Sequence, residues 1–150
     1  MCTSHKTGIA KEEKPMIHVI MGLKGSGKPK KLIDAIHGAV AEAHGDVVCI
    51  EYGKKLTYDI SYKVRLVDSK EYGICSAEML KGFLSGLHAG NFDITHVFID
   101  NLYKTIGADK VAGEAFIAWC AQFAADNNME ITITVSEDPA EASEEMKKYL

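Results

Sequence analysis

The feature that most constrains the fold is an apolar run that breaks into a glycine-rich loop and then into an amphipathic helix. The apolar run covers residues 16–21, and the loop that follows reads Gly22-Leu23-Lys24-Gly25-Ser26-Gly27-Lys28-Pro29. Beyond the loop, apolar residues recur at helical spacing, at Leu32, Ile33, Ile36, Val40 and Ala43. This order predicts a strand, a turn and a helix, the repeating unit of an α/β protein.

The loop has the composition of a turn that binds anions. Gly22, Gly25 and Gly27 can adopt backbone angles that other residues rarely adopt, so several N–H groups can turn toward one phosphate. The positive end of the following helix adds to the attraction, and Lys28 brings a full charge to the outer phosphates. The spacing fits G-x-x-x-x-G-K-[ST] except at the last position, where Pro29 stands.

This segment resembles the Walker A motif of the P-loop NTPases. The resemblance implies that residues 22–29 bind a nucleoside triphosphate, with ATP and Mg²⁺ as the expected ligands. In that family the last Ser or Thr gives a hydroxyl to Mg²⁺ and an N–H to phosphate, and Pro29 supplies neither. Proline is tolerated in a first helical turn, although it disfavours helical angles at the preceding Lys28. We expect an intact fold with a weakened metal site.

Strands and helices alternate along the rest of the chain. The patterns predict strands at 46–52, 62–67, 93–100 and 131–135. Helices are predicted from the loop to His44 with a left-handed stop at Gly45, over 76–90, after a cap at Asp109, and from the capping box at 138–141 toward Leu150. Whether the stretch before residue 62 is strand or a short crossover stays open.

These elements predict a three-layer α/β/α sandwich around a mostly parallel sheet of about five strands, the fold expected of a P-loop NTPase. Residues 1–15 are polar and lack any period, so we expect a flexible N-terminal tail. Residues 16–150 have the length of a single nucleotide-binding domain. Ligands of such sheets bind beyond the carboxyl ends of the strands.

Two more polar residues follow predicted strands at that edge. His96-Val97-Phe98-Ile99-Asp100 resembles a Walker B strand, whose carboxylate holds the Mg²⁺ shell, although many buried strands simply end in aspartate. Lys28 and Asp100 are therefore the expected catalytic residues. In the RecA-like branch, the next residue is commonly a Glu that activates water, whereas Asn101 cannot take a proton from water. Ser136 matches a position that senses the terminal phosphate, and equally fits a helix start.

Charge and hydropathy limit the partners. The formal net charge of -4 gives no general attraction for nucleic acid. No apolar run approaches the ~20 residues that span a bilayer, and the N-terminus lacks a secretory apolar segment, so we expect a cytoplasmic protein. Nucleotide is the expected partner, while a protein partner or a homo-oligomer stays open.

The leading hypothesis is ATP binding with weak or absent hydrolysis, because Pro29 and Asn101 occupy catalytic positions. The alternatives are an active small NTPase or nucleoside or small-molecule kinase, and a nucleotide-free protein-interaction module on a P-loop scaffold. The layout also resembles short bacterial single-domain ATP-binding proteins labelled twitching-motility, PilT-like. A thymidine-kinase-like relationship fits the strand order, but the paired cysteines of that family's zinc site are absent.

Overall fold

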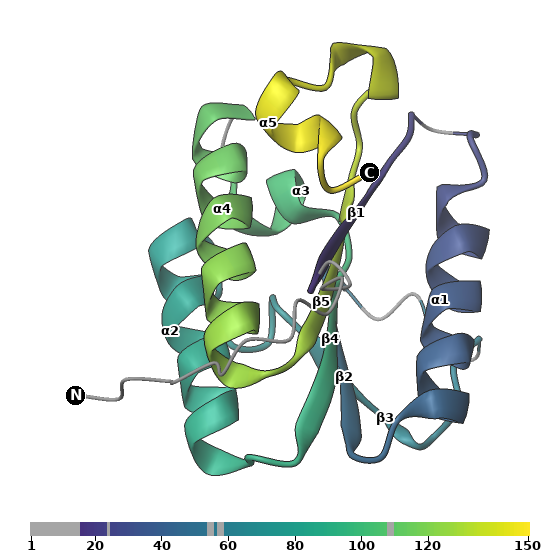
Figure 1. Ribbon diagram of the computed structural model, residues 1–150, viewed down its shortest axis with the longest axis vertical. Coiled ribbons are helices and arrows are strands. Elements are labelled where there is room, and N and C mark those ends of the chain that lie inside the picture. Colours follow the sequence, from purple (N-terminus) through teal and green to yellow (C-terminus); the bar gives the residue numbers. More distant parts are fainter. Residues whose placement is uncertain (1–15, 24, 54–55, 57–58, 108–109) are drawn as a thin grey trace, which may run out of the picture.

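A five-stranded parallel sheet forms the centre of the computed structural model, which describes residues 16–23, 25–53, 56, 59–107 and 110–150 (Figure 1). The strand order is β1-β5-β4-β2-β3, and every recorded pair is parallel. The strands are β1 (Ile17–Met21), β2 (Asp46–Glu51), β3 (Val64–Asp68), β4 (Ile94–Ile99) and β5 (Glu130–Val135). The predicted α/β class and parallel sheet are confirmed.

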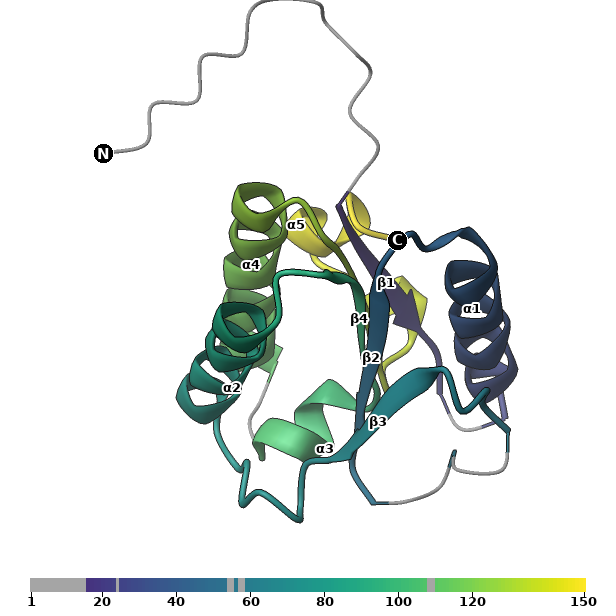
Figure 2. The same cartoon turned by 90° about the horizontal axis from the view of Figure 1, so that it is seen from below.

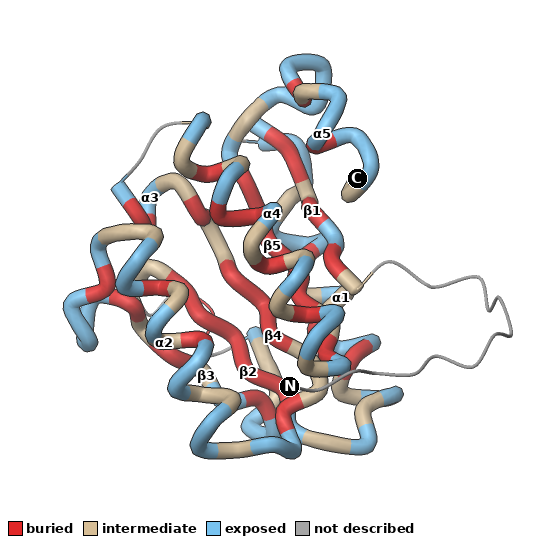
Figure 3. The backbone as a smooth tube through the Cα atoms, turned by 60° about the vertical axis from the view of Figure 1, so that its left-hand side comes forward, coloured by how far each residue is buried: buried red, intermediate tan, exposed pale blue. Residues whose placement is uncertain are grey.

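Helices cover both faces of the sheet. One face carries α1 (Lys28–Glu42), and the other carries α2 (Ala77–Gly90) and α4 (Lys110–Asn127), as Figure 2 shows. The short α3 (Leu102–Ile106) follows β4. Strand residues are mostly buried on both faces (Figure 3), because parallel strands lie between two helical layers. The architecture is therefore consistent with three layers.

The α1 face and the α2–α4 face have separate cores. The larger core lies under α2 and α4 and includes Leu84, Phe116 and Ile133, each at most 1% exposed. The smaller core lies under α1, where Leu32 and Ile36 pack among residues of β2, β3 and β4. The helices pack on both cores alongside the strands. The turns that connect helices and strands therefore lie at the amino and carboxyl ends of the strands.

The C-terminal segment differs from the prediction of one continuous helix. The Asp138 cap exists, since its Oδ1 accepts from the Ala140 N–H at 2.9 Å, but it begins only the 3₁₀ turn η1 (Pro139–Glu141). The chain is then extended at Ala142, and a second short helix, α5 (Glu144–Lys147), follows. A second cap begins α5, because the Ser143 hydroxyl accepts from the Met146 N–H at 3.2 Å, and both Ala142 and Met146 are buried against the larger core.

Gly45 does not form the predicted left-handed stop. Its φ is not positive, and α1 ends instead through an extended Ala43. Glycine is required at position 45 because an added Cβ would lie 2.0 Å from the Asp93 carbonyl oxygen. The predicted strand at 62–67 corresponds to β3 at 64–68, so the prediction was wrong for Tyr62 and Lys63, which lie in a turn. Described residues 56 and 59–61 are not strand, in agreement with the crossover alternative.

Some predictions fall on residues that the structure leaves out. Residues 1–15, Lys24, residues 54–55 and 57–58, and the predicted cap Asp109 lie outside the described ranges. Within those ranges, no helix is long and apolar enough to cross a membrane.

Candidate functional site

The glycine-rich loop adopts the backbone pattern that turns successive N–H groups to one side. Gly25 has φ 88° and Gly27 has φ 83°, while Ser26 between them has a negative φ. Such alternation forms a concave arrangement of amides that attracts anions. The Ser26 N–H donates to the Leu23 carbonyl oxygen at 3.1 Å, and no acceptor among the described residues is recorded for the N–H groups of Gly25 and Gly27. These two amides are available to a ligand.

The Lys28 side chain closes over the loop that precedes it. Its Nζ donates to the Gly22 carbonyl oxygen at 3.2 Å and to the Ser136 hydroxyl, which lies just beyond β5. Burial lowers the pKa of Lys28, and the negative charge of Asp100 partly offsets that effect. An ammonium group has three N–H donors, so one remains for a ligand.

Pro29 does not displace Lys28 from the helix, contrary to the preference expected from sequence. Lys28 is the first residue of α1, Gly27 is the N-cap and Pro29 is exposed in the first turn. The first N–H groups of a helix have no intrahelical acceptor, so proline removes no helical hydrogen bond at this position. The two hydrogen bonds of Nζ further hold Lys28 in place.

Asp100 lies beyond β4 and is held by its neighbours on both sides. Its N–H donates to the Ile50 carbonyl oxygen at 2.8 Å, and its Oδ1 accepts from Thr134 Oγ1 at 2.6 Å. The same threonine oxygen accepts from the Asn101 N–H at 2.7 Å. In the described part of the chain no donor is recorded for Oδ2 of Asp100. The carboxylate is therefore oriented by one oxygen and can bind a ligand through the other.

The backbone gives a reason for the amide at position 101. Asn101 is the N-cap of α3 and has left-handed angles, φ 56° and ψ 62°. Asparagine is among the few residues besides glycine that adopt this conformation readily. A glutamate would be strained in this turn, so the local geometry favours the asparagine that the sequence has.

The donor set fits a metal ion that arrives with a ligand. No group of three or more His, Cys, Asp or Glu residues that could hold a metal occurs in the described ranges. Mg²⁺ is commonly bound by one or two carboxylates together with waters and substrate phosphates. Asp100 provides one such carboxylate, and Pro29 removes the hydroxyl ligand expected at the start of α1. A weak Mg²⁺ site that needs a bound phosphate is consistent with these residues.

A cavity of about 490 Å³ lies elsewhere on the molecule. Val48, Arg65 and Leu87 are among its lining residues, together with residues at the amino ends of β2 and β4. Those ends face away from the loop, because in a parallel sheet all the carboxyl ends meet at the opposite edge. This cavity is therefore separate from the site built around Lys28.

Gly27→Ala is expected to destabilise the protein by about 1–2 kcal/mol, because alanine is strained at φ 83°. Gly38 is the matched control, since it lies inside α1 with no heavy atom within 4 Å of an added Cβ. Gly38→Ala should stabilise by about 0.5–1 kcal/mol through helix propensity. Urea denaturation of both variants measures the difference, and a Gly27→Ala protein as stable as Gly38→Ala would contradict the assigned loop conformation.

The structure brings several of the sequence-predicted residues together. Gly22, Lys28 and Ser136 are joined by hydrogen bonds, and Asp100 is near enough to influence the pKa of Lys28. Thr134 was not predicted, because a threonine within Ile131–Val135 is indistinguishable from a strand former. Leu23 lies within the loop and is 54% exposed, whereas Lys24 is not among the described residues. Comparison with known proteins finds no family model and no curated protein that matches this chain.

Proposed function

We propose that this chain is a single-domain P-loop protein that binds ATP or a related nucleoside triphosphate and hydrolyses it slowly or not at all. The observation that supports it most is the meeting of an ammonium, two amides without described acceptors and an oriented carboxylate at one sheet edge. Amides with alternating φ suit the inner phosphates, and Lys28 suits the outer ones. Asp100 would hold Mg²⁺ through water, as the Walker B resemblance implies.

Slow hydrolysis is expected because two catalytic contributions are missing. Pro29 lacks the hydroxyl and N–H that the resemblance assigns to metal and phosphate, and Asn101 cannot act as a general base. Loss of one well-placed charge stabiliser typically costs about a hundredfold in rate. Magnesium-dependent phosphate release near ~10 s⁻¹, the median for enzymes, would instead favour an active NTPase or kinase.

Thermal unfolding with and without ATP tests the proposal directly. A ligand that binds only the folded state stabilises it by about 2.7 kcal/mol at a hundred times its Kd. We therefore expect the melting temperature to rise with ATP concentration, and to rise further with Mg²⁺. An unchanged melting temperature at millimolar ATP, in both the presence and the absence of Mg²⁺, would overturn the proposal and favour a nucleotide-free interaction module.

Pro29→Thr is expected to strengthen Mg-ATP binding by about thirtyfold, because it adds one hydroxyl ligand and one N–H donor, each worth roughly 1 kcal/mol. Position 29 is exposed in the first turn of α1, so the change should not disturb packing. Pro29→Ala is the control, since it restores the N–H alone. Calorimetric titration should rank Thr above Ala and Ala above Pro with Mg²⁺. Equal affinities for all three would show that position 29 does not limit binding.

A further inference from the structure

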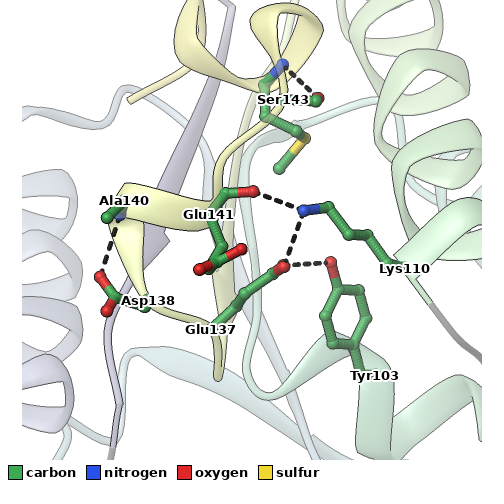
Figure 4. Close-up of polar contacts among 8 residues, drawn as sticks. Tyr103, Lys110, Glu137, Asp138, Ala140, Glu141 and Ser143 are labelled. Carbon is green, nitrogen blue, oxygen red and sulfur yellow. Dashed lines mark hydrogen bonds and ion pairs between the residues drawn. The ribbon is translucent and has the colours of Figure 1, made fainter.

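The carboxyl end of β5 connects to three other parts of the molecule within four residues. Thr134 holds Asp100, and Ser136 accepts a hydrogen bond from Lys28. Glu137, the next residue, points toward Tyr103 of α3 and Lys110 of α4 (Figure 4). Ser136 is exposed, whereas the Glu137 side chain is only 17% exposed. Ser136, which bonds to Lys28 of the loop, is thus followed directly by Glu137, which bonds to residues of α3 and α4.

Glu137 is held by two groups from different helices. Tyr103 of α3 donates its hydroxyl to Glu137 Oε2 at 2.9 Å, and Lys110 at the start of α4 pairs with Glu137 Oε1 at 3.0 Å. Lys110 also donates to the Glu141 carbonyl oxygen, so it joins η1 to the same cluster (Figure 4). Both carboxylate oxygens of Glu137 are occupied, which restricts its rotation and that of the adjoining peptide.

Tyr103 provides a firm anchor for this contact. A Cβ added to Gly113 of α4 would lie 2.2 Å from the Tyr103 ring, so the ring packs directly on the helix backbone. Burial raises the pKa of Tyr103, as do its hydrogen bond to Glu137 and the negative charges of Glu137 and Glu114. The hydroxyl therefore stays protonated and continues to donate to Glu137 at ordinary pH.

We propose that Glu137 is a positioning residue that fixes the Ser136 hydroxyl beside the Lys28 ammonium, and thereby makes the site favour a triphosphate over a diphosphate. The proposal rests on the proposed function, which puts the outer phosphates at Lys28. A hydroxyl next to that ammonium would be nearest the terminal group of a triphosphate, because the loop amides would take the inner phosphates and the lysine would reach the outer ones. Releasing Glu137 would let Ser136 turn away while the loop stays intact.

The experiment compares the affinities of the whole chain for ATP and for ADP by calorimetric titration. Glu137→Ala should weaken ATP binding by about tenfold, the effect of one charge-assisted contact, and leave ADP binding within about twofold. Tyr103→Phe keeps the ring against Gly113 but removes the hydroxyl. It should therefore lower the ratio of the affinity for ATP to the affinity for ADP, even if Glu137→Ala folds poorly. Glu144→Ala is the matched control, because Glu144 is an exposed glutamate in a lysine pair away from the loop.

The outcomes separate this proposal from the one on which it depends. A positioning role is supported if Glu137→Ala or Tyr103→Phe lowers the ratio of ATP affinity to ADP affinity while Glu144→Ala keeps the wild-type ratio. Equal losses for both nucleotides, or an unchanged ratio in both site variants, would overturn it and indicate a purely structural ion cluster. Wild-type protein that binds neither nucleotide would overturn the proposed function itself.

Discussion

Under the proposed function, replacing Lys28 by alanine is expected to weaken ATP binding by about ten- to a hundredfold. The ammonium is partly buried, which strengthens its attraction for phosphate, and hydrogen bonds to charged groups contribute about 1.5–3 kcal/mol. Each 1.4 kcal/mol is a factor of ten in affinity. The fold should persist, because the hydrogen bonds of the Lys28 side chain to described residues go to a loop carbonyl and to the exposed Ser136. Calorimetric titration of wild type and variant measures the loss.

Lys30→Ala is the control for this experiment. Lys30 lies in the same helical turn and is exposed, so the variant has the same net charge as Lys28→Ala without loss of the loop contact. General electrostatic attraction from an exposed lysine is screened by salt, and its loss should lower affinity by less than about threefold. Equal losses in the two variants would show that Lys28 acts only through net charge, and an unaltered Lys28→Ala affinity would remove the site from consideration.

Much of the fold could be predicted from the sequence, because its patterns are local. Period two in residues 62–67 and the apolar run at 46–52 each depend on neighbours in the chain, and they overlap the strands at 64–68 and 46–51. The order β1-β5-β4-β2-β3 depends on contacts between distant residues, which no local pattern contains. The predicted C-terminal helix was wrong in its length, since the cap at Asp138 begins only a 3₁₀ turn and a second cap at Ser143 begins α5.

In the candidate site, too, the residues that belong to a local sequence pattern could be predicted, and those that depend on contacts between distant strands could not. The loop was recognisable because glycines and a lysine at this fixed spacing, between a strand and a helix, are typical of phosphate-binding turns, and Ser136 followed from its place after a strand. Thr134 and Glu137 were missed, because threonine inside a strand and glutamate after one are ordinary choices. Only the pairing of β4 with β5 shows that this threonine lies beside Asp100.

Thr134→Val should destabilise the protein by about 1–3 kcal/mol, although it hardly changes the volume of the side chain. Thr134 is fully buried, and its hydroxyl both donates to Asp100 and accepts from the Asn101 N–H. Valine would leave a carboxylate oxygen and a backbone donor without these partners, and buried polar groups that lose a partner are costly. Urea denaturation measures the change, with an unaltered m-value as the sign of two-state unfolding.

Thr132 of the same strand provides the comparison that isolates the hydroxyl. It is 9% exposed, and no side-chain hydrogen bond is recorded for it within the described ranges, so Thr132→Val should change stability by less than about 0.5 kcal/mol. Equal costs for the two variants would mean that the contact with Asp100 contributes nothing beyond β-propensity. Under the proposed function, Thr134→Val should also reduce the gain in ATP affinity that Mg²⁺ provides. An Asp100 carboxylate that is free to rotate holds a metal shell less well than one that is fixed, whereas the loop amides and Lys28 are unaffected.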